Sequence, residues 1–232
     1  MNVVMPMAGE GVRLQGYSEV PKPLIKINDY NMFLWSLQRI PPHNNFIFIV
    51  KDEHVLNYSI DKTIYEFYPN AKIVIQDSKL DGAVMSTMLA ESLIDNDEPL
   101  LIVDCDIFVD VDYDELVYYT QSDAALVVSE NSSENYSYAL VNNGLVTKVA
   151  EKEVISNNAI SGVYFWKKGS DYIKYAKQLI SKDIKTNNEF YVAPVFNEAI
   201  QDGKTVSVIR TDTFYHLGTK EDISMFLGDP IE

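Results

Sequence analysis

The chain has 232 residues, a length typical of one domain. Its 19 basic and 34 acidic residues give a formal charge of −15, which disfavours nucleic acid or an anionic membrane surface as a partner but allows a small anionic substrate in one locally basic cleft. The single cysteine, Cys105, excludes an intramolecular disulfide and a multi-cysteine metal site. Because the sequence also has no membrane-length apolar run and no leader-type start, we expect a cytoplasmic protein.

Short apolar runs rich in β-branched residues alternate with amphipathic segments in the first half of the chain. This alternation is typical of βαβ units that feed a mainly parallel sheet. The expected strands are Asn2–Met7, Phe46–Val50, Lys72–Gln76, Leu100–Val103 and Ala124–Ser129. The expected helices are Met32–Arg39, Val55–Tyr68, Val84–Ile94 and Tyr113–Gln121.

The second half of the chain predicts a hairpin followed by mixed elements. Asn142-Asn143-Gly144 favours positive φ, so it should join strands at Ser137–Val141 and Leu145–Ala150. The remaining expected elements are a strand at Ala159–Trp166, helices near Asp171–Ser181 and Val192–Gln201, a strand at Thr205–Arg210 and a helix at Lys220–Leu227 with Thr219 as its N-cap. Without repeats or linkers, the pattern predicts one α/β domain over residues 1–232, a three-layer α/β/α fold with a mainly parallel mixed sheet.

A glycine-rich loop follows the first expected strand. It reads Ala8-Gly9-Glu10-Gly11-Val12-Arg13-Leu14 and is followed by Pro21-Lys22-Pro23-Leu24. Glycines directly after a buried strand let the backbone turn sharply and present N–H groups to an anion. Arg13 can grip phosphate oxygens as a fork, and Lys22 can add a point charge. For the glycines alone, a tight turn with two surface cations is the structural alternative, and the P-loop and dinucleotide patterns are both absent.

This strand, Gly-x-Gly-x-Arg-Leu and Pro-Lys-Pro-Leu together resemble the signature of the nucleotidyltransferases that activate sugar phosphates and phosphocholine, a family with a GT-A type α/β fold. The resemblance implies electrostatic catalysis by Arg13 and Lys22. It implies that the nucleotide is bound by the loop residues Ala8, Gly9, Glu10 and Gly11. It also implies a nucleotide-binding half at about residues 1–110 and an acceptor-binding half at about 111–232.

Two carboxylates end the fourth expected strand, in Asp104-Cys105-Asp106. Side chains alternate along a strand, so Asp104 and Asp106 can point the same way at the carboxyl edge of the sheet, where a hard cation would offset their repulsion. Solvated loop acids are the structural alternative. The resemblance implies that Asp106 binds Mg²⁺ and that Asp104 belongs to the nucleotide site, although Cys105 stands where the family carries glycine.

A closing sequence, Tyr215-His216-Leu217-Gly218-Thr219-Lys220-Glu221-Asp222, is similar to a segment that follows a second metal-binding aspartate in many sugar nucleotidyltransferases. Here His216 occupies the place of that aspartate. Three alternatives stay open: His216 is a nitrogen ligand or an orienting donor, Asp212 supplies the carboxylate, or Asp106 holds the metal with phosphates and water.

Gln76 and Gly82 are the candidates for reading the base. A glutamine amide can pair with donor and acceptor atoms of a base edge, and a glycine permits close backbone contact. Gly82 also opens the expected helix that carries Ser86. A strand-end side chain meeting water and a helix cap are the structural alternatives, and the family places a base-reading glutamine and a glycine at similar points.

The acceptor site is expected from motif order in the second half of the chain. Glu151-Lys152, Asn158 and the segment around Tyr191 are similar to the family's acceptor-binding stretches, with Lys152 on the acceptor phosphate and Glu151 on a polar group. Solvated charges on a hairpin and a core tyrosine are the structural alternatives.

The resemblance therefore predicts transfer of a nucleoside monophosphate from an NTP to a small phosphorylated acceptor, with release of pyrophosphate and Mg²⁺ as cofactor. The short chain and its closing motif favour CTP and the cytidylyltransferase branch, with surface or capsule polysaccharide biosynthesis as the setting. Rival readings are a GT-A glycosyltransferase that uses an NDP-sugar through Asp104-Cys105-Asp106, or an inactive nucleotide-binding relative. The sequence leaves homo-oligomer formation open.

Overall fold

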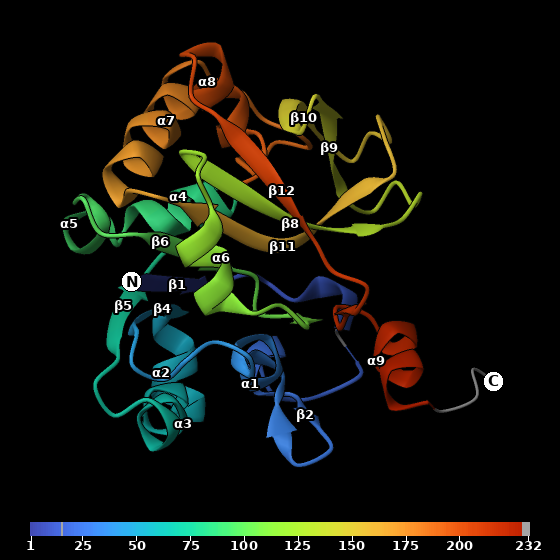
Figure 1. Ribbon diagram of the computed structural model, residues 1–232. Helices are drawn as coiled ribbons and strands as arrows, with labels where there is room; N and C mark the ends of the chain where they lie inside the picture. Colours follow the sequence, from blue (N-terminus) through green and yellow to red (C-terminus); the bar gives the residue numbers. More distant parts are fainter. Residues whose placement is uncertain (15, 229–232) are drawn as a thin grey trace.

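In the computed structural model, which describes residues 1–14 and 16–228, nine strands form one sheet with helices on both faces (Figure 1). These strands are β1 (Asn2–Pro6), β4 (Asn45–Lys51), β5 (Lys72–Gln76), β6 (Leu100–Val103), β8 (Ala124–Glu130), β9 (Ser137–Asn142), β10 (Leu145–Glu151), β11 (Asn158–Trp166) and β12 (Val206–Arg210). Two small sheets within the described ranges pair β2 (Lys26–Ile27) with β3 (Tyr30–Asn31) and β7 (Ile107–Val109) with β13 (Phe214–His216).

Helices connect these strands. They are α1 (Met32–Leu37), α2 (Asp52–Tyr58), α3 (Ile60–Phe67), α4 (Ala83–Met88), α5 (Glu91–Ile94), α6 (Tyr113–Tyr119), α7 (Gly169–Ser181), α8 (Val195–Gln201) and α9 (Lys220–Leu227), with 3₁₀ turns η1 (Val12–Leu14) and η2 (Lys22–Leu24). The predicted α/β class with a mainly parallel mixed sheet is confirmed.

The sheet topology brings four strand ends to one edge. The order is β10-β9-β11-β6-β1-β4-β5, with β8 and β12 joined through β11. β1 pairs in parallel with β4 and β6, and β5 pairs in parallel with β4. The carboxyl ends of β1, β4, β5 and β6 therefore lie together, where loops of an α/β sheet form ligand sites.

Alternation along the strands divides the core between the two faces of the sheet. In β1, Val4 joins one cluster of buried side chains, whereas Val3 and Met5 join the other. Helices α4, α5, α7 and α8 cover the first face, and α1, α3 and α6 cover the second. Figure 1 shows the same division, with α7 and α8 above the sheet and α1, α2 and α3 below it.

Two expected helices are divided, and α8 begins later than predicted. The segment expected as one helix at Val55–Tyr68 forms α2 and α3, because Ser59 takes a left-handed conformation with φ 51°. The segment expected at Val84–Ile94 similarly forms α4 and α5. Helix α8 starts at Val195 and not at Val192, since Pro194 disfavours helical geometry in the residue before it.

The predicted hairpin is confirmed. Strands β9 and β10 pair antiparallel, and Asn143 and Gly144 between them have φ of 49° and 80°. These values are those of a two-residue turn that follows the twist of its strands. The short strands β2, β3, β7 and β13 were not predicted, because two- and three-residue strands carry too little periodicity.

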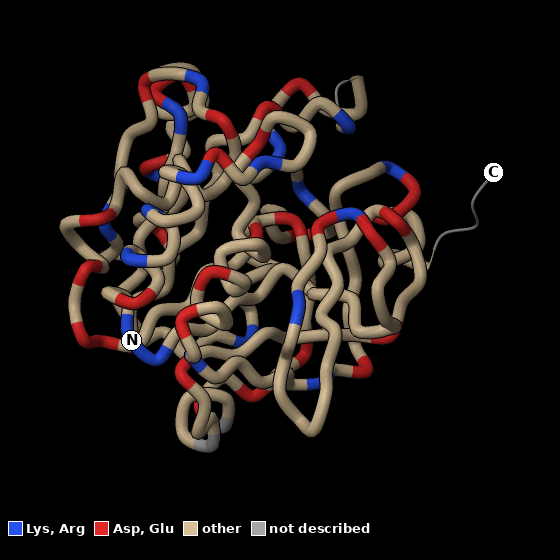
Figure 2. The backbone as a smooth tube through the Cα atoms, turned by 90° about the horizontal axis from the view of Figure 1, so that it is seen from above, with Lys and Arg blue, Asp and Glu red and all other residues tan. Residues whose placement is uncertain are grey.

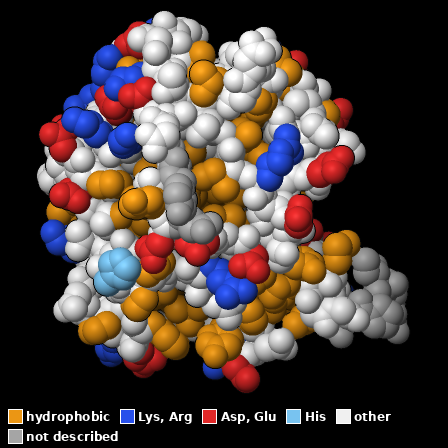
Figure 3. Space-filling view, in the orientation of Figure 1, with side chains coloured by type: hydrophobic (Ala, Val, Ile, Leu, Met, Phe, Trp, Pro, Cys, Tyr) orange, Lys and Arg blue, Asp and Glu red, His pale blue; other side chains and the backbone are white. Residues whose placement is uncertain are grey.

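The surface charge is dispersed. In Figure 2 basic positions are scattered among acidic ones, and Figure 3 shows both kinds interspersed with apolar side chains on one face. The potential in any cleft therefore depends on its own lining residues and not on the net charge alone. None of the helices in the described ranges has both the length and the apolar composition that crossing a bilayer requires.

Candidate active site

The loop after β1 lies at the carboxyl edge of the sheet and faces the ends of β5 and β6. Gly11 has φ +60°, and a Cβ at this position would lie 3.1 Å from Cβ of Lys22. Glycine is thus needed both for the turn and for the close approach of the lysine segment. Leu14 is buried beside Leu217 and Ile223 near α9, which anchors the end of the loop.

A chain of charged side chains crosses this edge. The Lys22 ammonium forms an ion pair with Oδ2 of Asp106, and Nε2 of His216 lies 3.3 Å from the same oxygen. Nδ1 of His216 lies 2.8 Å from Oδ2 of Asp222, which also accepts a hydrogen bond from Thr219. Asp106 and His216 come together because His216, the last residue of β13, pairs with Ile107 of β7, the residue after Asp106.

The partners of Asp106 decide its ionisation. Burial by itself would raise the pKa of Asp106, but Lys22 and His216 hold it well below the usual range. Burial opposes the charged form of His216, yet the hydrogen bonds to Asp106 and Asp222 outweigh it and raise the pKa of His216 to about 9. At neutral pH the imidazole is therefore protonated and donates to both carboxylates.

Asp104 sits in a different environment two residues earlier. Burial and the neighbouring charge of Asp106 raise the pKa of Asp104 to about 7. Its backbone N–H donates to the carbonyl of Gly162, whose φ is +72°. A Cβ on Gly162 would lie 2.8 Å from Oδ2 of Asp104, so glycine in β11 leaves the space that this carboxylate occupies.

Two hollows meet at these charged residues. One, of about 300 Å³, extends to Gln76, Gly82 and Ser86 at the end of β5 and the start of α4. The other, of about 590 Å³, extends to residues of the second half of the chain, including Tyr136, Glu151 and Lys152. Their shared wall consists of Gly9, Glu10, Gly11, Arg13, Lys22, Lys79, Asp104, Asp106, Glu189 and Tyr191.

The shared wall explains what the cleft can bind. Arg13 is exposed, and among the described residues its guanidinium has no hydrogen-bond or ion-pair partner. Together with Lys22 it offers positive charge beside carboxylates, between two compartments of small-molecule size. Such an arrangement suits a polyphosphate bridging two organic groups.

A family model described as nucleotidyl transferase matches residues 2–226. The chain belongs to the nucleotidyl transferase family. It is an enzyme of the nucleotidyltransferase type. The comparison with curated proteins gave no match.

Solved structures of nucleotidyltransferases share its fold. A nucleoside-diphosphate-sugar pyrophosphorylase from Vibrio cholerae RC9 superposes with a TM-score of 0.84 at 21% identity, over 98% of this chain and 100% of that one. An inositol-1-phosphate CTP transferase from T. maritima gives 0.74 at 16%, over 95% and 90%. A UDP-glucose pyrophosphorylase complexed with UDP-glucose gives 0.73 at 15%, over 96% and 95%. At these identities the likeness concerns the fold.

Within this nucleotidyltransferase, the structure brings most predicted site residues together. Eight of them lie in the shared wall: Gly9, Glu10, Gly11, Arg13, Lys22, Asp104, Asp106 and Tyr191. Ala8, Gln76 and Gly82 line the smaller hollow, whereas Glu151, Lys152 and His216 line the larger one. The ammonium of Lys152 donates to Oη of Tyr191 at 2.9 Å, which joins two of the predicted acceptor residues.

Asn158 and Asp212 do not line either hollow. Asn158 is buried, donates to the carbonyl of Ala139 and accepts from Arg210 at 2.6 Å, so its amide is used in holding strands together. These contacts give Asn158 a structural role, and its acceptor role stays a prediction. Asp212 is exposed and does not line the hollow that contains Asp106 and His216.

The conformation and packing of Gly82 give a structural reason for glycine at this position. Its φ is +99°, and a Cβ there would lie 2.6 Å and 2.7 Å from the backbone oxygen and nitrogen of Phe190. Glycine is required for packing against this neighbouring segment, even though the residue also lines the hollow. The structural alternative thus accounts for Gly82 without a ligand.

Sequence reasoning missed two charged residues at or beside the site, Lys51 and Lys79. Lys51 ends β4, and its ammonium lies 2.8 Å from the carboxylate of Glu10, which ties the glycine loop to the sheet. Its place at the end of a parallel strand beside β1 was a usable signal. Lys79 enters the shared wall from an irregular segment, for which the sequence carries no comparable signal, and Glu189 enters it from the predicted segment around Tyr191.

The donors around Asp106 fit a divalent cation held mainly by the substrate. Among the described residues, no group of three or more His, Cys, Asp or Glu side chains could hold a metal ion by itself. Mg²⁺ commonly needs only one or two protein carboxylates, with phosphate oxygens and water completing its shell. The ionised Asp106 beside a polyphosphate-sized cleft meets that requirement. Metal ligation by His216 stays a prediction.

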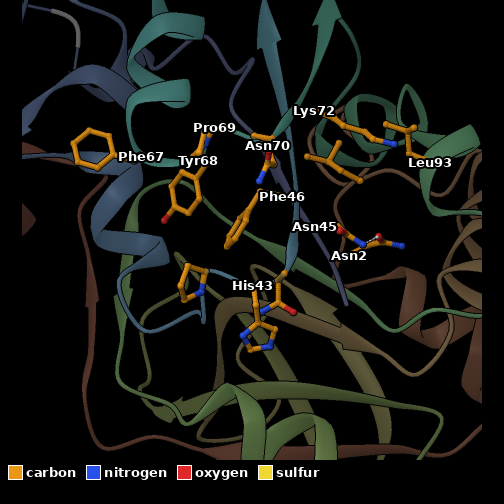
Figure 4. Close-up of a pocket in the computed structure, with 14 residues that line it drawn as sticks. Asn2, His43, Asn45, Phe46, Phe67, Tyr68, Pro69, Asn70, Lys72 and Leu93 are labelled. Atoms are coloured by element: carbon orange, nitrogen blue, oxygen red, sulfur yellow. Dashed lines mark hydrogen bonds between the residues drawn. The ribbon is translucent and has the colours of Figure 1, made fainter.

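A further hollow of about 490 Å³ lies at the opposite edge of the sheet. Figure 4 shows Asn2, Asn45 and Lys72, the first residues of β1, β4 and β5, beside His43 and Tyr68. Its polar lining consists mostly of amides, and it contains no carboxylate among the described residues that line it. This chemistry does not match a phosphate-transfer site, so the carboxyl edge is the candidate.

Proposed function

We propose that this nucleotidyltransferase moves a nucleoside monophosphate from an NTP to the phosphate of a small acceptor, with release of pyrophosphate. The observation that carries this proposal is the wall of Arg13, Lys22, Asp104 and Asp106 shared by two compartments. A triphosphate along this wall would place its base toward Gln76 and its α-phosphate toward the acceptor compartment. The α-phosphate of the NTP and the phosphate of the acceptor would then lie next to each other.

The proposed reaction uses no enzyme nucleophile. An acceptor phosphate oxygen attacks the α-phosphorus, the bond from that phosphorus to the bridging oxygen breaks, and pyrophosphate leaves with its electron pair. Arg13 and Lys22 neutralise charge on the nucleotide phosphates and on the departing pyrophosphate. Mg²⁺ bound at Asp106 would supply further positive charge there. We infer that His216 donates a hydrogen bond to the carboxylate of Asp106 and thereby orients it.

We propose a phosphorylated sugar or polyol as the acceptor. The structural neighbours are named for nucleoside diphosphate sugars, inositol 1-phosphate and UDP-glucose, which supports that class. In the larger compartment, Lys152 can meet the acceptor phosphate, and Glu151, which accepts a hydrogen bond from Ser137, can meet a hydroxyl group. We favour CTP as the nucleotide, on the closing motif, with surface polysaccharide synthesis in the cytoplasm as the setting.

A pyrophosphate-release screen tests the proposal. The four NTPs are combined with a panel of phosphorylated sugars, polyols and alcohols in the presence of Mg²⁺. We expect one NTP and acceptor pair to release pyrophosphate and form a nucleoside diphosphate product. A complete absence of turnover over the panel, or a bound triphosphate lying far from residues 8–22 in a crystal, would contradict the proposal.

The substitution Lys22→Ala tests the proposed catalytic role of the Lys22 ammonium. Loss of its charge from the buried wall should lower the turnover of the productive pair at least ~100-fold. Lys26→Ala is the matched control, because Lys26 is exposed on the same segment and lies outside both hollows. Thermal unfolding of both variants checks the fold, since Asp106 loses an ion-pair partner in the first one. A folded Lys22→Ala enzyme with full activity would refute the catalytic role.

A further inference from the structure

The base end of the cleft contains a buried relay of hydrogen bonds. Gln76 ends β5 and is 5% exposed, and Ser86 in α4 is 8% exposed. Nε2 of Gln76 donates to the carbonyl oxygen of Ser78 at 2.9 Å, while its Oε1 accepts from the hydroxyl of Ser86 at 2.7 Å. Gln76 and Ser86 both line the smaller hollow.

This relay determines the orientation of the Gln76 amide. If the amide turned over, its oxygen would face the carbonyl oxygen of Ser78, and two acceptors would meet at a partly buried contact. Ser86 adds a donor at the other end, which only the oxygen of the amide can accept. The backbone of one strand end and one helix side chain thus select the same orientation of the amide.

An amide held in one orientation can discriminate between two bases, whereas a freely rotating amide cannot. Cytosine presents an amino donor beside a ring acceptor, whereas uracil presents a carbonyl acceptor beside a ring donor. Because turning a glutamine amide exchanges its donor and its acceptor, a free amide can match either edge. An amide held in one orientation matches one edge and opposes the other with like groups, which costs binding energy.

We propose that Ser86 is a positioning residue that sets base selectivity by holding Gln76 in one orientation. This inference rests on the proposed nucleotide-binding function of the cleft. The hydroxyl of Ser86 acts through the amide, and its proton is committed to Gln76. Nothing in the position of Ser86, near the start of α4, otherwise calls for a buried hydroxyl.

Nucleotide binding tests this inference without turnover. The dissociation constants of all four NTPs are measured by calorimetry for the wild-type protein, Ser86→Ala and Ser86→Thr. We expect the wild type to separate CTP from UTP. Loss of one buried hydrogen bond should reduce the ratio of the two constants about tenfold in Ser86→Ala. Ser86→Thr, which keeps the hydroxyl, should retain the ratio.

Controls separate this inference from the proposed function. Ser181→Ala in α7 removes an exposed helical hydroxyl away from the cleft and should leave the ratio unchanged. Ser86→Cys replaces Ser86→Ala if the latter does not fold, with the same expected loss. A wild type that binds no NTP overturns the function and the inference together. A wild type that binds without separating CTP from UTP, an unchanged ratio in Ser86→Ala, or a failure of Ser86→Thr to retain it overturns the inference alone.

Discussion

Asp104 and Asp106 stand two residues apart at the end of the same strand, yet their surroundings push their pKa values in opposite directions. Asp106 meets Lys22 and His216 and is held ionised. Asp104 meets no comparable cation, so burial and the charge of Asp106 raise its pKa to about 7. A paired carboxylate beside one that is easily protonated is a typical arrangement of a site that binds charge.

Replacing Asp104 by asparagine should stabilise the protein. Between the ordinary pKa of 3.8 and about 7, the unfolded state releases the Asp104 proton before the folded state does, so rising pH lowers the free energy of unfolding. Asparagine removes this penalty. In urea unfolding, we expect the free energy of unfolding of Asp104→Asn to exceed that of the wild type by on the order of 2 kcal/mol at pH 8. The difference should be much smaller at pH 4.

The matched control for that prediction is Asp77→Asn, because Asp77 is an exposed aspartate. It should change the free energy of unfolding by less than ~0.5 kcal/mol at either pH. A destabilised Asp104→Asn protein at pH 8 would show that the carboxylate is held by favourable contacts.

Among the elements, the start of α9 supports the charged side chains of the site. Thr219 is its N-cap: the side chain accepts from the backbone N–H of Asp222 and donates to Oδ2 of the same residue at 2.6 Å. Asp222 in turn holds His216. A local capping motif thus positions a side chain that reaches Asp106.

Thr219→Val should weaken both the helix and the site. Loss of the cap should lower the free energy of unfolding by about 1 kcal/mol. Because Asp222 then loses one of its two side-chain donors and holds His216 less firmly, pyrophosphate release by the productive pair should also fall. Thr63→Val, a substitution within α3, is the control for the change of residue type. Equal urea midpoints for Thr219→Val and the wild type would contradict the capping role.

Gly162 in β11 contributes to the site because its lack of a Cβ leaves space for the carboxylate of Asp104. Gly162→Ala would combine a left-handed φ of +72° with a Cβ against Asp104. We expect a loss of ~1–3 kcal/mol in urea unfolding, from strain and displacement of the carboxylate. Gly144→Ala is the control: its φ is also positive, +80°, but its added Cβ meets open space. A smaller loss for Gly162→Ala than for Gly144→Ala would argue against the contact with Asp104.

The stability of the whole molecule should respond to pH through His216. Its folded pKa of about 9 lies above the ordinary 6.5, so its contribution is fully present below 6.5 and is lost as pH rises through 9. We expect the free energy of unfolding to fall between pH 7 and pH 10 by on the order of 2 kcal/mol more in the wild type than in His216→Gln. Parallel pH profiles of the two proteins, followed by urea unfolding, would contradict this.

Much of the architecture could be predicted from local patterns. Strands such as β5 and β6 are apolar, β-branched runs bounded by turn residues, and Asn143-Gly144 specifies its turn through backbone sterics. The divisions at Ser59 and Ala90 could not, because the helical pattern continues across them and only tertiary packing favours the break. The sequence could also place the Gly-x-Gly loop, Arg13 and Lys22 at the carboxyl edge of the sheet, because they follow the first strand closely in the chain.

By itself, the sequence determined the α/β class, the glycine loop with its two cations and the carboxylates at the end of β6, since each depends on residues close together in the chain. Only the tertiary structure decided that Asp106 is ionised while Asp104 is easily protonated, that His216 lies between two carboxylates, and that Asn158 holds strands together. The physical reason is that ionisation and hydrogen-bond partnership depend on neighbours brought from distant parts of the chain, and on how far those neighbours exclude water.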